Sequence, residues 1–379
     1  MHARGETIRL ATRGSELARR QAATVAEALE SRRRAVELVE IETTGDQLRD
    51  ELIHRLGTTG AFVRSLDEEV LAGEVDAAVH SMKDVPTEAH PELVIAGVPE
   101  RASAGDVLVA PEGETLAALP DGATVGTSSL RRGAELRAAR PDLQVESLRG
   151  NVDTRVEKLL APGLQREHEA RLDAEAEEGE NGDGKDEDSE NENGEGHDFE
   201  RSVQDWFDGL REIERRALER DVETEYDAIV LAAAGLERTG LIHTVPTTRL
   251  DPTEFVPAPG QGALAITARD DEVGQLLHDV LDHPPSRVET TVERVVLDEL
   301  GGGCVAPVGI HARLQGKYVT TSVRVLARDG SEEVAASREL PVERHAEAAR
   351  EFAADLAERG AADLIQAARR EEPDEAKRG

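Results

Sequence analysis

Strand patterns and helix patterns alternate along the first part of the chain, and this alternation constrains the fold more than any other feature. An apolar run at residues 8–12 precedes a helix pattern that opens at Ser15, and further strand patterns follow at 36–41, 75–79 and 93–98. Alternation of this kind is typical of a largely parallel sheet covered by helices. The sequence therefore predicts an α/β lobe at this end of the chain.

The same alternation begins again in the middle of the chain. Strand patterns at residues 123–126, 145–148 and 228–232 are separated by helix patterns, the first of which we expect to open at Thr127 or Ser128. A second α/β lobe is therefore predicted.

The last third of the chain has a different pattern. A helix pattern through residues 288–300 precedes alternating strands near 305–314 and 319–326, and a long Ala-rich helix is expected from Val342 onward. This order predicts a separate α+β domain.

An acidic insertion at about residues 162–223 interrupts the second lobe. Residues 173–198 are almost wholly Glu, Asp, Gly and Asn, so they bury too little apolar surface to fold, and we expect disorder there. The only tryptophan, Trp206, follows in a stretch whose apolar residues share one helical face. We expect one helix there, docked on the rest of the protein.

The charge of the chain limits its partners. There are 79 acidic and 45 basic residues, a net charge of −34, which argues against nucleic acid or an anionic membrane as partner. Few lysines and 2% aromatic residues are typical of a salt-adapted protein.

The chain shows no signal sequence and no run of about 18 apolar residues, and its single cysteine allows no intramolecular disulfide. We expect a soluble cytoplasmic protein.

Lys83 and Asp84 follow a strand pattern in the segment AVHSMKDVP at residues 78–86. Open α/β sheets place ligands beyond the carboxyl ends of their strands, so both side chains are candidates for a site. A surface ion pair at a strand end is the alternative.

Two strand-to-helix turns carry arginines that suit a ligand bearing several carboxylates. They are Arg131 and Arg132 in VGTSSLRR, and Arg149 and Arg155 in SLRGNVDTR. Arg grips a carboxylate through two parallel hydrogen bonds, and helix N-termini add backbone donors. In so acidic a chain, pairing with nearby Asp or Glu is the alternative.

Cys304 lies in the glycine-rich segment GGGCVAPVG, residues 301–309, where a bulky group can approach closely. A lone cysteine is otherwise more often an inert small apolar residue. The segment PAPGQG at residues 257–262 would by itself be only a turn.

Taken in order, IRLATRGS, HSMKDVP, VGTSSLRR, SLRGNV, APGQGA and GGCVAPVG resemble the signature of the hydroxymethylbilane synthase, or porphobilinogen deaminase, family. The resemblance covers about residues 8–160 and 224–330. It implies two lobes like those of type II solute-binding proteins, joined by crossovers near 99–105 and 255–261, and a smaller α+β domain. The implied domains are residues 1–99 with 262–280, residues 105–255, and residues 284–379.

The resemblance also implies an activity and a cofactor. Four porphobilinogen molecules would be condensed head to tail with loss of ammonia, on a dipyrromethane primer bound to Cys304 through a thioether, and the linear tetrapyrrole hydroxymethylbilane would then be released by hydrolysis. Asp84 is the implied catalytic carboxylate. The implied cofactor contacts are Lys83, Ser129, Arg131, Arg132 and Asp46. The implied substrate contacts are Arg13, Ser15, Arg149, Arg155 and Arg238. No metal is implied, and a monomer is expected.

The chain departs from the family pattern at Thr59, where many members have lysine, and at residues 102–105 beside the first crossover. An alternative function is that of a two-lobed intracellular binding protein for a polycarboxylate ligand. The cysteine-bearing third domain counts against it.

Overall fold

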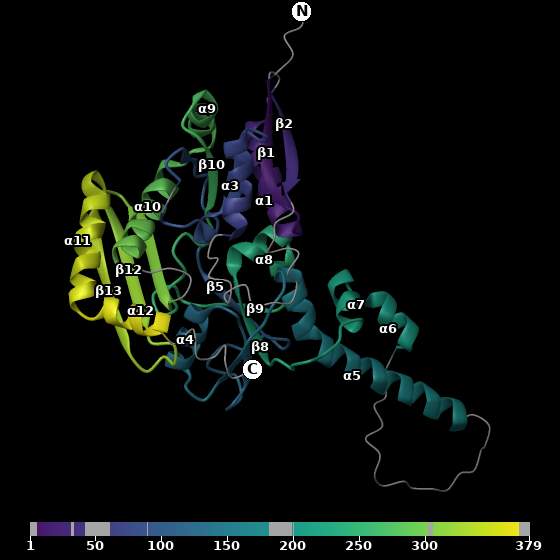
Figure 1. Ribbon diagram of the computed structural model, residues 1–379. Coiled ribbons are helices and arrows are strands. Elements are labelled where there is room, and N and C mark those ends of the chain that lie inside the picture. Colours follow the sequence, from purple (N-terminus) through teal and green to yellow (C-terminus); the bar gives the residue numbers. More distant parts are fainter. Residues whose placement is uncertain are drawn as a thin grey trace, which may run out of the picture.

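The computed structural model describes residues 6–31, 34–41, 61–88, 90–181, 199, 201–301 and 306–370. Two five-stranded sheets and one three-stranded sheet form three domains in contact with one another (Figure 1). Asp46, Thr59 and Cys304 lie outside the described residues, as does most of the stretch at 173–198 that we expected to be disordered.

The first lobe is built on a sheet with strand order β2-β1-β3-β10-β4. β2 and β3 run parallel to β1, whereas β10 is antiparallel to both β3 and β4. The strands are β1 (Glu6–Arg13), β2 (Arg34–Ile41), β3 (Ala77–Ser81), β4 (Leu93–Gly97) and β10 (Leu264–Arg269). The helices are α1 (Glu16–Leu29), α3 (Ala61–Ala72) and α9 (Glu272–Leu281).

The second lobe repeats this plan with the order β7-β6-β8-β5-β9. In each sheet, the fourth strand is formed by chain that has just crossed from the other lobe. The strands are β5 (Asp106–Val109), β6 (Thr124–Gly126), β7 (Gln144–Glu146), β8 (Ala228–Ala232) and β9 (Thr247–Arg249). The helices are α4 (Leu130–Ala139), α5 (Val152–Asn181), α6 (Val203–Gly209), α7 (Glu212–Leu218) and α8 (Ala233–Thr239). The predicted pair of α/β lobes is confirmed, although β5 and β9 were not predicted.

Helix α4 begins later than predicted. The backbone N–H of Thr127 donates to the carbonyl of Glu146, so Thr127 still belongs to the sheet edge. Ser129 is the N-cap, and its hydroxyl accepts a hydrogen bond from the backbone N–H of Arg132.

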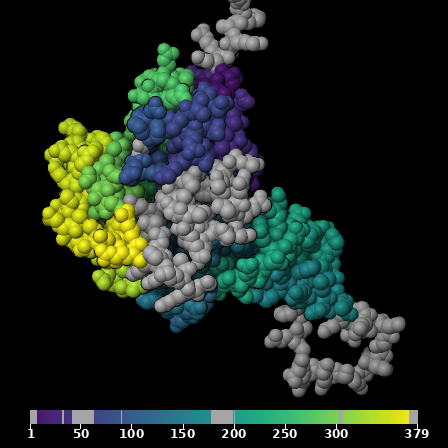
Figure 2. Space-filling model, viewed as in Figure 1, coloured from purple at the N-terminus to yellow at the C-terminus, as the bar shows by residue number. Residues whose placement is uncertain are grey.

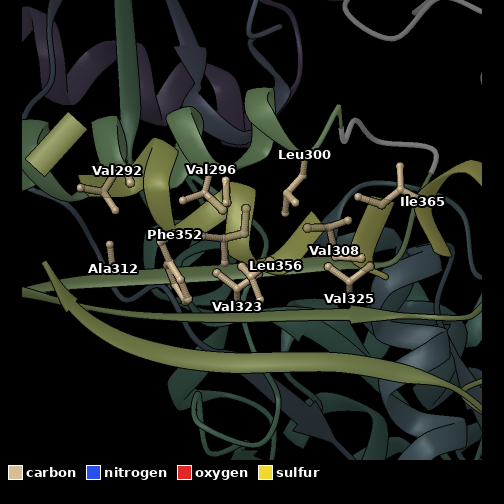
Figure 3. Close-up of a cluster of buried hydrophobic side chains, with 14 of the residues drawn as sticks. Val292, Val296, Leu300, Val308, Ala312, Val323, Val325, Phe352, Leu356 and Ile365 are labelled. Atoms are coloured by element: carbon tan, nitrogen blue, oxygen red, sulfur yellow. The ribbon is translucent and has the colours of Figure 1, made fainter. Parts of the chain in front are cut away.

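The third domain packs three helices against an antiparallel sheet, with order β11-β12-β13. Figure 3 shows its core, where Val292, Val296 and Leu300 of one helix meet Phe352 of the next and Val323 of the sheet. The elements are β11 (Val308–Gln315), β12 (Tyr318–Leu326), β13 (Glu333–Pro341), α10 (Pro284–Glu299), α11 (His345–Glu358) and α12 (Ala361–Arg370). The α+β prediction is confirmed.

The expected single Ala-rich helix of this domain is instead the pair α11 and α12. Gly360, with φ of 101°, lies between them in a backbone conformation that ends a helix. β13 was not predicted, because most of its side chains are exposed and it lacks a clear apolar alternation.

The prediction for the acidic insertion was wrong in part. α5 continues as a helix to Asn181, through Pro162 and past the start of the stretch that we expected to be disordered. Gln165 explains part of this, since its side-chain amide donates to the carbonyls of Leu218 and Arg220 and ties α5 to the end of α7. The helices α5, α6 and α7 form an arm beside the second lobe (Figures 1 and 2).

The expected Trp206 helix is two short helices, α6 and α7, with a break at Leu210. The indole of Trp206 is buried and stacks on His168 of α5, with ring centroids 5.8 Å apart. Phe207, which the one-helix pattern placed on the apolar face, is exposed. The tryptophan therefore docks on α5 of the second lobe.

One buried carboxylate joins both crossovers to the third domain. Glu293 of α10 accepts two hydrogen bonds from Arg101 of the first crossover, at 2.7 and 3.0 Å, and one from the backbone N–H of Gly260 in the second, at 2.6 Å. It also accepts from the N–H of Ala312 in β11. The division into residues 1–99 with 262–280, residues 105–255 and residues 284–379 stays a proposal.

Candidate active site

Lys83 and Asp84 lie in a short 3-10 turn, η2 (Met82–Asp84), directly after β3. β3 is almost fully buried, which fixes the start of the turn, and the N–H of Met82 donates to the carbonyl of Ala263. On its other side the turn meets Gly260, where an added Cβ would lie 2.7 Å from Cγ of Met82. The turn is therefore held between the sheet and the second crossover, with both charged side chains exposed.

Lys83 of the first lobe is close enough to charged residues of the second lobe for them to shift its pKa. Crowding by protein lowers the pKa of Lys83 from its ordinary value, although part of the side chain stays exposed. Asp84 raises this pKa, whereas Arg132 and Arg155 of the second lobe lower it further. No hydrogen bond or ion pair joins Lys83 to another described residue. Positive charge is thus in excess between the lobes.

Arg131 and Arg132 have a shared buried partner in Asp106. Nη2 of Arg131 lies 2.6 Å from Oδ2 of Asp106, and Nε and Nη2 of Arg132 lie 3.0 and 2.7 Å from Oδ1. Burial alone would raise the pKa of Asp106, but attraction to the two guanidinium groups outweighs it and holds that pKa below its ordinary value. Both arginines are therefore oriented by the protein itself.

Gln261 and Glu135 complete this buried network. Gln261 donates to Asp106 at 3.0 Å and to the carbonyl of Ala104 at 2.6 Å, which joins the two crossovers to each other. Glu135 accepts from Nη1 of Arg131 at 2.7 Å. The sequence did not indicate Asp106, Glu135 or Gln261 as site residues. Gln261 was the detectable one, because it lies in the singled-out segment at residues 257–262.

The other predicted site arginines of the second lobe have few partners within the protein. Nε of Arg155 donates only to the carbonyl of Gly150, at 2.8 Å. Burial, together with repulsion from Arg132, lowers the pKa of Arg155 to about 10. Arg149 is half-buried, and among the described residues it has no hydrogen bond or ion pair. Nη2 of Arg238 donates to the carbonyl of Gly262 at 2.7 Å.

Arg13 and Ser15 lie where the sequence places them, at the end of β1 and the start of α1. Ser15 caps α1, since its hydroxyl accepts from the N–H of Ala18 at 3.3 Å. Arg13 is half-buried at the carboxyl end of β1, the same end of the sheet from which Asp84 follows β3.

Comparison with protein families decides between the alternatives. Residues 8–176 and 211–275 match the porphobilinogen deaminase dipyromethane cofactor binding domain, and residues 288–359 match the porphobilinogen deaminase C-terminal domain. The chain belongs to the porphobilinogen deaminase family. It is therefore a transferase that polymerises porphobilinogen, with a dipyrromethane cofactor, and the binding-protein alternative has no comparable support.

Curated relatives agree with this assignment. The chain is 54% identical over 392 residues to a protein of Halobacterium salinarum named probable porphobilinogen deaminase, with 97% of this chain and 99% of the relative covered. It is 38% identical to the porphobilinogen deaminase of Roseiflexus sp. (strain RS-1), with 86% and 88% covered. The Halobacterium relative supports the predicted salt adaptation.

Solved structures give weaker similarities. The alkanesulfonate-binding protein SsuA from Xanthomonas axonopodis pv. citri aligns with a TM-score of 0.30 at 13% identity, covering 79% of this chain and 77% of that one. The ectoine-binding protein TeaA in its apo state aligns with a TM-score of 0.32 at 10% identity, covering 96% and 99%. Within the described ranges, no helix is long and apolar enough to cross a bilayer.

Proposed function

We propose that the junction between the two lobes is the active site of this porphobilinogen deaminase, with Asp84 as the catalytic carboxylate and Cys304 as the cofactor anchor. The observation that carries the proposal is the excess of positive charge at this junction. Lys83, Arg149 and Arg155 form no ion pair or hydrogen bond with a carboxylate among the described residues, although the whole chain carries a net charge of −34. A polycarboxylate ligand would supply the missing negative charge.

The residues present fit a dipyrromethane, which carries acetate and propionate groups. Desolvation chiefly lowers the pKa of Lys83 and of Arg155, and repulsion from Arg132 lowers both further; a bound carboxylate would relieve that repulsion. Nε of Arg131 is a buried donor without a partner among the described residues, and a ligand oxygen could satisfy it. We therefore propose Lys83, Ser129, Arg131 and Arg132 as cofactor contacts, with Asp46 added from the family resemblance.

Asp106 gives Arg131 and Arg132 a role different from that of the unpaired cations. With Glu135, it supplies two buried carboxylates for these two guanidinium groups, so this cluster adds fixed geometry rather than net charge. The net field comes from Lys83 and Arg155. We propose Arg13, Ser15, Arg149, Arg155 and Arg238 as contacts for the carboxylates of incoming porphobilinogen.

Asp84 is suited to the chemical step. Loss of ammonia from porphobilinogen leaves positive charge on its methylene carbon and pyrrole ring, which an ionised carboxylate stabilises. The same carboxylate can accept and return a proton. The turn that holds Asp84 is fixed by β3 and by Gly260, so the carboxylate needs little reorganisation. The cofactor supplies the pyrrole carbon to which the first substrate is joined.

We further propose that the protein acts as a monomer in the cytoplasm. Both expectations follow from the resemblance to the family.

The test is the intact mass of the protein purified in high salt, compared with that of Cys304→Ala. We expect wild type to carry an added mass equal to two porphobilinogens less two ammonia, and the variant to lack it. Failure of wild type to gain this mass, even after incubation with porphobilinogen, would refute the proposed anchor and cofactor.

A further inference from the structure

Arg294 of α10 contacts the backbone that leaves the Asp84 turn. Its Nη1 donates to the carbonyl of Val85 at 2.8 Å, and its Nη2 donates to the carbonyl of Pro86 at 2.7 Å. One planar guanidinium therefore holds two consecutive carbonyls immediately after the proposed catalytic residue. Lys carries its three N–H donors on a single nitrogen, so it cannot reproduce a planar pair of nitrogens that each donate to one of these carbonyls.

The helix that carries Arg294 is itself fixed. Val292 and Val296 are buried in the core of the third domain (Figure 3), and an i, i+4 pair of this kind sets which face of the helix points inward. Arg294 lies on a different face, directed at the first lobe. The preceding residue, Glu293, is tied to both crossovers. Arg294 thus extends from a rigid support.

Side-chain packing does little of this work on the α10 side of the turn. A pocket of about 210 Å³ separates α10 from the first lobe there, lined by Met82, Thr87, Ile95, Thr291 and Arg294 among others. Val85 packs on the sheet side against Met82 and its buried neighbours, and the two hydrogen bonds from Arg294 restrain the chain after Asp84 from the α10 side.

We propose that Arg294 is a positioning residue for the porphobilinogen deaminase reaction, which holds the turn of Asp84 in register with the third domain. This inference rests on the proposed role of Asp84. α10 ends at Glu299, shortly before Cys304 in the sequence, so the same helix that restrains the catalytic turn leads into the segment proposed to anchor the cofactor. Misplacement of a reacting group by about 1 Å can cost roughly 100-fold in rate.

The test compares Arg294→Met with Arg287→Met. Arg287 also lies on α10 and also donates to carbonyls of the first lobe, those of Ile95 and Ala96 at 3.1 and 3.2 Å, but it does not touch the turn. We expect R294M, corrected for its cofactor-loaded fraction by intact mass, to lose roughly 10- to 100-fold in kcat with KM changed less than about threefold. R287M should keep wild-type kcat, even where its melting temperature falls.

Amide hydrogen exchange gives a readout independent of activity. The peptide spanning residues 78–87 should exchange faster in R294M than in wild type or R287M. Unchanged exchange in R294M, or an equal loss of kcat in both variants, would overturn the proposal. If R294M does not fold, Arg294→Lys takes its place, and wild-type kcat and exchange in R294K would overturn the proposal equally.

Asp84→Asn separates this inference from the function on which it rests. Full activity in D84N would refute the proposed catalytic role of Asp84, whereas the exchange comparison would still report whether Arg294 restrains the turn. Faster exchange in R294M together with a large loss of kcat in D84N is the result that supports both.

Discussion

Replacing Glu293 by glutamine tests how much the joint between the crossovers and the third domain contributes to stability. The carboxylate is fully buried and accepts four hydrogen bonds, two from Arg101 and one each from the N–H groups of Gly260 and Ala312. Glutamine has nearly the same shape but turns one acceptor into a donor. In the variant, the amide NH2 of glutamine therefore points at a group that is itself a donor. The buried Arg101 also loses its closest countercharge.

The expected loss follows from the burial of the pair. Removing one partner of a buried ion pair costs about 3–5 kcal/mol, because the other charge stays desolvated. The unfolding entropy is about 2.1 cal/mol/K per residue, which gives about 0.8 kcal/mol/K for a chain of 379 residues that unfolds as one unit. We therefore expect the melting temperature of E293Q to fall by about 4–6 °C.

Glu289→Gln is the matched control, one turn earlier on α10. Glu289 accepts one backbone hydrogen bond, from Leu314 at 2.9 Å, and its nearest approach to Arg101 is 3.9 Å. Its side chain is 17% exposed, so water can compensate part of the loss, and we expect a smaller shift, about 1 kcal/mol. The assay is scanning calorimetry in high KCl. A melting temperature for E293Q within 1 °C of wild type, or equal shifts in both variants, would refute the reasoning.

Two further predictions concern charge. Burial raises the pKa of Glu135 to about 7 from an ordinary value of 4.5, so the folded state binds the proton more tightly than the unfolded state does. The free energy of unfolding should therefore fall by about 3 kcal/mol as the pH rises from about 4.5 to about 7. Glu135→Gln should lose this slope in denaturant titrations at pH 5 and 8, whereas the exposed control Glu112→Gln should keep it; the same slope in E135Q would contradict the assignment. Because the net charge is −34, the melting temperature should also rise between about 0.1 M and about 3 M KCl as self-repulsion is screened, and no change would count against salt adaptation.

The sequence predicts the two lobes and the third domain because their buried elements have clear periods. It does not reveal β5 or the network around Asp106. The partners of Asp106 lie far apart in the chain, with Gln261 155 residues away, and only the crossing of the chain between lobes brings them together. A short buried strand such as β5 also lacks the length that makes an apolar run distinctive.

The acidic insertion shows why composition alone misleads. Residues 162–181 are rich in Glu, Ala and Arg, which favour helices as strongly as they oppose a core. Tertiary contacts decide the outcome, since Gln165 binds the end of α7 and Arg171 lies over the ring of Trp206, 5.3 Å from its centroid. None of these contacts is visible in a local charge count.

Salt adaptation and the chemistry of the site place opposite demands on the same charges. At molar salt the Debye length is about 3 Å, so exposed arginines attract a carboxylate only weakly. Buried groups are screened less, and Arg155, which is half-buried and has its pKa lowered to about 10 chiefly by burial, is partly withdrawn from water. Asp106 and Glu135 meanwhile supply countercharges for the buried Arg131 and Arg132, which limits the cost of burying them. Partial burial of a cation such as Arg155 thus favours anion binding in a chain whose overall charge opposes it.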